Sequence, residues 1–69
     1  MARNDGFAST LRALRAKEDM TQAELAKQIG VDKSTIINWE SGEYMPNLRV
    51  ATTLADIFGV TLEQLVGRA

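Results

Sequence analysis

Residues 22–41 read QAELAKQIGVDKSTIINWES, and this stretch decides how the chain folds. Apolar side chains recur at helical spacing on both sides of Gly30, which predicts two amphipathic helices. They are Leu25, Ala26 and Ile29 in the first segment and Ile36 and Trp39 in the second. Gly30 stands where the chain has to turn, since glycine adopts a left-handed backbone at little cost. Two short helices joined in this way on a shared core predict a helix-turn-helix motif.

Three further helices are predicted around this pair. Helical spacing of apolar residues indicates one helix over residues 6–17, one over 48–58 and a short one over 62–66, beside the motif helices at 22–29 and 33–41. The apolar side chains that carry this spacing are Phe7, Leu11, Leu14, Ala51, Leu54, Ala55, Phe58, Leu62, Leu65 and Val66. Capping side chains are expected at Asp5, Thr21, Asp32, Asn47 and Thr61. The predicted fold class is all-α, with five helices in one compact domain.

Length and composition limit the possible functions. The chain has 69 residues, so we expect a single domain over 1–69 with residues 1–5 as a flexible tail. It has no His and no Cys, and its charged residues (eight Lys and Arg, nine Asp and Glu) show no paired acid–base arrangement. We therefore expect no enzyme activity, and no cofactor, metal or small-molecule ligand. No apolar run is long enough to cross a membrane, so a cytoplasmic location is expected.

Six blocks of the sequence resemble one known family. The blocks cover residues 11–15, 21–26, 34–36, 39–42, 46–48 and 54–60. In this order they are similar to the Cro/lambda-repressor-like helix-turn-helix domains, also called the xenobiotic-response-element type. The resemblance implies a DNA-binding transcriptional regulator whose third helix enters the major groove of double-stranded DNA, usually as a homodimer on a palindromic operator.

The resemblance also implies which residues contact DNA. Gln22, at the start of the second helix, takes the phosphate-binding position, and the groove-facing positions fall on Lys33, Ser34 and Asn38. Lys33 suits guanine, Asn38 suits adenine, and Ser34 suits any base. The complete set of expected DNA-binding residues is Arg12, Gln22, Lys33, Ser34, Ile37, Asn38, Ser41 and Tyr44. The alternative for Gln22 is a solvated residue at the start of a helix, and the alternative for Lys33, Ser34 and Asn38 is an ordinary solvated helix face.

Ile37 departs from the polar residue that is common at its position in the family. Two interpretations stay open: contact with a thymine methyl group, or partial burial at the rim of the core. Arg15 and Glu40 match a family pair that forms a largely buried salt bridge between the first and third helices. The alternative is two unrelated surface charges.

A core this small contributes only about 3–5 kcal/mol, which favours dimerisation. The expected dimer surface consists of Ile57, Val60, Leu62, Leu65 and Val66; the alternative is that the fifth helix covers these side chains within one chain. The net charge of −1 and the acidic Glu43 predict weak non-specific DNA binding, with Arg49 as a further cation. For Arg3 there are two interpretations, an arm that reaches the minor groove and an ordinary disordered tail, and the tail is favoured. Two other functions remain open: a protein-interaction module on the same fold, and the antitoxin of a toxin–antitoxin pair.

Overall fold

The computed structural model describes residues 5–67, except for the side chain of Asp5, and every regular element in that range is helical. The helices are α1 (Asp5–Lys17), α2 (Gln22–Ile29), α3 (Lys33–Glu40), α4 (Leu48–Phe58) and α5 (Leu62–Leu65). The predicted all-α class with five helices is therefore confirmed. Asp5 is the first residue of α1, so the helix begins one residue earlier than predicted and Asp5 does not occupy the predicted cap position before it. The rest of the predicted tail, with Arg3, lies outside the described residues.

Local capping sets most of the helix starts. Side-chain caps form at Thr21, Asn47 and Thr61. At the first of these, the Glu24 N–H donates to Thr21 Oγ1 at 3.0 Å and the Thr21 N–H donates to Glu24 Oε1 at 2.8 Å, which completes a capping box. Asp32 occupies the cap position of α3, but its side chain makes no capping hydrogen bond, so that part of the prediction is wrong. The start of α3 consequently depends on its tertiary contacts.

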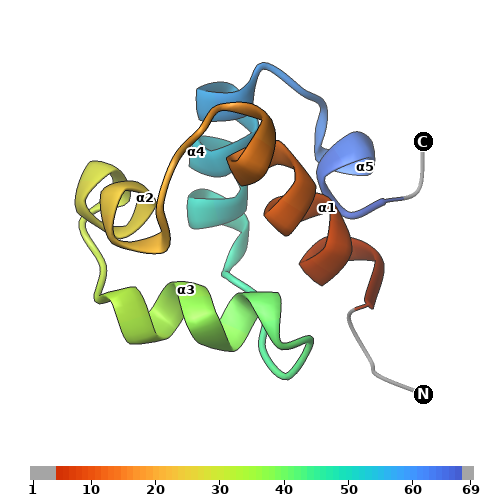
Figure 1. Ribbon diagram of the computed structural model, residues 1–69. Coiled ribbons are helices and arrows are strands. Elements are labelled where there is room, and N and C mark those ends of the chain that lie inside the picture. The colour runs from red at the N-terminus through yellow and green to blue at the C-terminus, as the bar shows by residue number, and fades with distance from the viewer. Residues whose placement is uncertain (1–4, 68–69) are drawn as a thin grey trace.

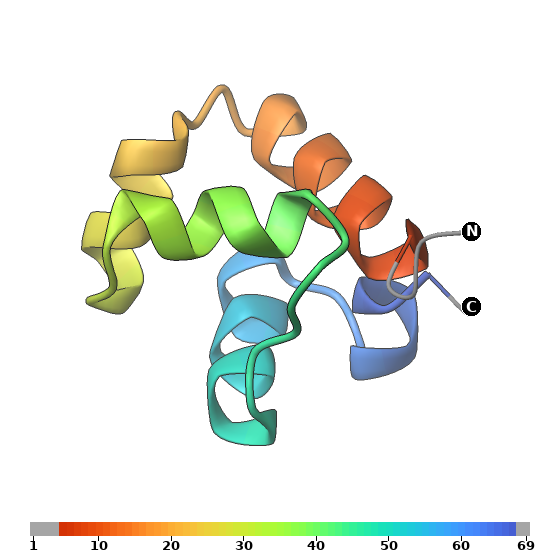
Figure 2. The ribbon, with the colours of Figure 1, turned by 90° about the horizontal axis from the view of Figure 1, so that it is seen from below.

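The helices surround one core. α2 and α3 are joined at Gly30, whose φ of 80° is the left-handed conformation predicted for the turn. Figure 1 shows α3 along the bottom of the molecule, with α1, α4 and α5 above it. The most deeply buried side chains are Phe7, Leu11, Leu25, Ile36, Leu54 and Leu65, which come from all five helices. α3 is therefore attached to the domain along its upper side, and Figure 2 shows no helix covering its lower side.

Gly6 and Gly67 bring the two ends of the described chain together. A Cβ atom built on Gly6 would lie 2.8 Å from the carbonyl oxygen of Val66, and one built on Gly67 would lie 2.9 Å from the carbonyl oxygen of Gly6. Real Cβ atoms essentially never approach backbone atoms so closely. The absence of a side chain at these positions lets the start of α1 pack against the turn that follows α5.

We expect Gly6→Ala to destabilise the domain by about 1–3 kcal/mol, because the new methyl group displaces backbone atoms. At an ordinary solvent-exposed position of a helix, Gly→Ala stabilises the protein by about 1 kcal/mol. The change in stability expected at Gly6 therefore has the opposite sign. Urea unfolding followed by circular dichroism measures the difference. Ser9→Ala, at an exposed position of the same helix, is the control and should change stability by less than about 0.5 kcal/mol. A more stable Gly6→Ala protein would contradict the described contact.

Candidate nucleic-acid interface

The two sides of α3 differ in burial. Ile36 is fully buried and Trp39 is 6% exposed, so both side chains hold the helix against the core. Lys33, Ser34 and Asn38, for which the sequence predicts groove contacts, are all exposed. The structure thus brings the three polar side chains to solvent on a helix whose inner side is anchored by buried side chains.

Ile37 lies among these polar side chains and is 45% exposed. The partly buried apolar residues that pack on the core do not include it. This placement favours the interpretation in which Ile37 faces an external contact over the one in which it completes the rim of the core. An isoleucine there offers methyl groups, which suit a thymine methyl better than a polar base edge.

Ser41 and Tyr44 follow α3 in the loop before α4. The Ser41 hydroxyl donates to the carbonyl oxygen of Asn38 at 2.6 Å and accepts from the Glu43 N–H at 3.1 Å. Its single hydroxyl hydrogen is therefore committed to the end of the helix, and Ser41 would have to break that bond to donate to a phosphate. Tyr44 is 59% exposed, which leaves its side chain accessible to a ligand.

Arg15 and Glu40 form an ion pair between α1 and α3. Arg15 Nε donates to Glu40 Oε2 at 2.7 Å, and Arg15 Nη2 donates to Glu40 Oε1 at 3.2 Å. The third guanidinium nitrogen, Nη1, donates to the carbonyl oxygen of Met20 at 2.8 Å. The hydrogen bond with Glu40 raises the pKa of Arg15 above its usual value, so the guanidinium stays charged throughout the pH range in which proteins are studied.

Glu40 also binds two residues for which the sequence predicts contacts with DNA. Gln22 Nε2 donates to Glu40 Oε1 at 3.0 Å, and Arg12 Nη1 donates to the carbonyl oxygen of Glu40. Sequence reasoning missed both contacts. One signal was available: a buried carboxylate has about four acceptor sites, more than one arginine fills, so another donor had to be sought. Arg12 is consequently in part a capping residue for α3 rather than a free cation.

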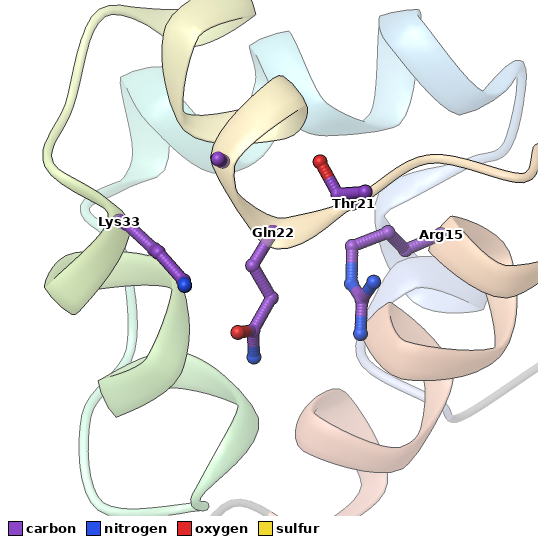
Figure 3. Close-up of a pocket in the computed structure, with 5 residues that line it drawn as sticks. Arg15, Thr21, Gln22 and Lys33 are labelled. Carbon is purple, nitrogen blue, oxygen red and sulfur yellow. The ribbon is translucent and has the colours of Figure 1, made fainter.

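A surface pocket of about 390 Å³ lies where α1, α2 and α3 meet. It is lined by Arg15, Thr21, Gln22, Ala23 and Lys33. Figure 3 shows the end of the Gln22 side chain between those of Lys33 and Arg15. The pocket has the size and polarity to admit an anionic group, with the start of α2 on one side and the Lys33 ammonium on the other. Within residues 5–67, no cluster of acidic side chains is arranged to hold a metal ion.

The expected dimer surface is only partly exposed. Leu65 is fully buried in the core, and Val60 packs against the core. Including Leu65 in an intermolecular surface was therefore wrong, because α5 buries this side chain within its own domain. Leu62 and Val66 instead line an apolar groove of about 400 Å³ together with Met45, Pro46, Leu48, Ala51 and Glu63. Ile57 is half-buried on α4.

None of the helices within residues 5–67 is long and apolar enough to span a bilayer.

A glycine turn between two packed helices, the second with an anchored inner side and a polar outer side, defines a helix-turn-helix domain. The helix-turn-helix family model matches residues 11–65. The chain belongs to the Cro/lambda-repressor-like, xenobiotic-response-element type of helix-turn-helix proteins, a family of DNA-binding transcriptional regulators.

Similar proteins occur in distant organisms. The chain is 47% identical over 55 residues to an HTH-type transcriptional regulator of Archaeoglobus fulgidus, covering 80% of this chain and 79% of the relative. It is 40% identical over 60 residues to the cryptic phage CTXphi transcriptional repressor RstR of Vibrio cholerae, covering 87% of this chain and 54% of the relative. The solution structure of the SOS-response transcriptional repressor LexA from Eubacterium rectale superposes with a TM-score of 0.86 at 33% identity, covering 93% of this chain and 68% of that one.

We expect Glu40→Ala to cost about 3–5 kcal/mol, because Arg15 would keep a partly buried charge without its partner. That loss equals the whole stability expected of so small a core, so the variant should be largely unfolded at 25 °C. Arg15→Met combined with Glu40→Leu replaces the pair by apolar side chains of similar size and should remain folded. Thermal unfolding by circular dichroism distinguishes the two, with Glu18→Ala as the exposed-glutamate control. Equal melting temperatures for Glu40→Ala and Glu18→Ala would contradict the proposed structural role of the pair.

Proposed function

We propose that this chain is a transcriptional repressor that binds a palindromic operator as a homodimer, with α3 in the major groove. The observation that carries the proposal is the exposed face of Lys33, Ser34, Ile37 and Asn38 on a helix anchored by Ile36 and Trp39. The family of the chain and the repressors among its relatives support the same function. In this arrangement Asn38 reads adenine, Lys33 reads guanine, and Ile37 contacts a thymine methyl.

The slight excess of acidic over basic residues shapes how the chain would bind DNA. Eight cationic and nine anionic residues give a net charge of −1, and Arg12 and Arg15 are engaged with Glu40. Phosphate neutralisation dominates non-specific binding, so a single copy should bind random DNA weakly. Two copies on one operator would double the base contacts, and the function therefore depends on pairing.

Pairing through the groove of Met45, Leu48, Leu62 and Val66 fits the geometry of an operator. Met45 and Pro46 of the loop between α3 and α4 line the groove, so a partner joined there would lie near the C-terminal end of α3. The Cα atoms of the domain extend over 27 × 23 × 23 Å. With side chains added, two domains in contact are spaced comparably to half-sites one helical turn apart, about 34 Å.

We expect Asn38→Ala to weaken operator binding by about 1–3 kcal/mol and to relax the preference at one base pair per half-site. The operator comes from an unbiased binding-site selection with the wild-type protein, and fluorescence anisotropy at fixed salt measures the affinity. Gln28→Ala, which removes an exposed amide from α2, is the control and should leave affinity and preference unchanged. Wild-type affinity for Asn38→Ala on every single-base variant of the operator would overturn the assignment of α3 as the reading helix.

We expect Leu48→Ser to weaken dimerisation, because this side chain is 72% exposed and lines the groove. Sedimentation velocity is measured across a series of protein concentrations. The variant should dissociate into monomers at a concentration at which the wild type is still a dimer. Ile37→Ser likewise replaces an exposed apolar side chain by serine, but on α3. It should leave the dimer intact and alter only DNA binding. If both variants sediment like the wild type, the groove is not the dimer interface.

A further inference from the structure

The side-chain amide of Gln22 is held from inside the molecule. Gln22 Nε2 donates to Glu40 Oε1 at 3.0 Å, and the Glu40 side chain is only about 5% exposed. The same oxygen accepts from Arg15 Nη2 at 3.2 Å, while the other carboxylate oxygen accepts from Arg15 Nε at 2.7 Å. Glu40 is therefore fixed by Arg15, and in turn it fixes the position of the Gln22 amide.

This contact leaves part of the amide available. A primary amide has two N–H donors, and one of them is used by Glu40. Because the amide is planar, fixing one N–H also fixes the direction of the other N–H and of the oxygen. Gln22 lines the pocket that Lys33 shares, and Figure 3 shows the amide between Lys33 and Arg15. Gln22 is partly exposed at this pocket beside the start of α2, and Glu40 uses one of the two donors of its amide.

We propose that Glu40 is a positioning residue for DNA binding and acts through Gln22, which it orders so that the free amide donor meets a backbone phosphate. This inference rests on the proposed function, because it requires the DNA contact of Gln22. An unrestrained glutamine would lose rotamer freedom on binding, whereas one already held by Glu40 has lost that freedom on folding. The negative charge of Glu40 does not repel the phosphate appreciably, since Arg15 neutralises it at 2.7 Å.

A double-mutant cycle tests whether the contribution of Gln22 to binding depends on Glu40. Gln22→Ala is made in the wild type and in the Arg15→Met/Glu40→Leu background, which keeps the net charge of the chain and removes the acceptor of the amide. Affinities are measured on the duplex recovered by selection with the wild type. We expect Gln22→Ala to weaken binding about fivefold in the wild type. In the double-variant background we expect less than about a twofold effect, since the amide there is already disordered.

The control is Gln28→Ala in the same two backgrounds, because Gln28 is an exposed glutamine of the same helix. It should have no effect on binding in either. Equal losses from Gln22→Ala in both backgrounds would overturn the role of Glu40, and so would the absence of a loss in the wild type. Failure of the wild-type protein to bind any duplex would instead contradict the proposed function itself, which separates the two failures.

A measurement on the unmodified protein keeps the inference falsifiable if the double variant does not fold. Side-chain ¹⁵N relaxation compares the amide groups of Gln22 and Gln28 in the free domain. We expect an order parameter for Gln22 approaching that of rigid backbone, about 0.85, and one below about 0.6 for Gln28. Equal, low order parameters for the two glutamines would show that Glu40 does not hold the amide, and the proposal would fail.

Discussion

The carboxylate of Glu40 is the charged group that the described part of the domain buries, at 6% exposure for the residue. Removing a carboxylate from water costs several kcal/mol unless its oxygens are hydrogen-bonded and its charge is paired. Here both conditions hold, because Arg15 binds both oxygens and Gln22 binds one of them. The donors come from α1 and α2, so the burial of this group requires that three helices keep their relative positions.

The position of α3 depends more on its contacts with α1 and α2 than on interactions within the helix. With eight residues α3 is shorter than the length at which isolated helices become stable, and its cap residue Asp32 makes no side-chain hydrogen bond. Its first turn has no acidic residue and its last turn no basic one to favour the helix dipole. Ile36 and Trp39 anchor the inner side of the helix, and Arg12 and Arg15 hold its last residue. The exposed side of α3 is therefore held in position by contacts made on the opposite side of the helix.

Local signals explain what could be predicted from the sequence. Caps such as Thr21 and Asn47, and the left-handed turn at Gly30, involve residues within four positions of one another, so the helix bounds follow from the sequence almost residue by residue. Contacts between distant segments do not follow from such signals. The bond from Gln22 to Glu40 joins residues 18 apart, and the burial of Leu65 depends on how α5 packs on α1 and α4. Helical periodicity identifies the apolar side of a short helix without specifying whether the same chain or another one covers it.

The chain has a net charge of −1, so the proposed DNA binding would depend strongly on where its few cationic and amide donors are placed. A strongly basic domain can tolerate poorly placed side chains, because its bulk attraction to phosphate compensates for them. In this chain Arg12 and Arg15 are used to hold Glu40, and the exposed donors near the start of α3 are reduced to a few, among them Lys33 and the amide of Gln22. Each of these donors must then be well placed to contribute. A buried acidic residue beside the proposed DNA-binding surface is consistent with this requirement, since Arg15 pairs with its charge and its carboxylate accepts a hydrogen bond from the Gln22 amide.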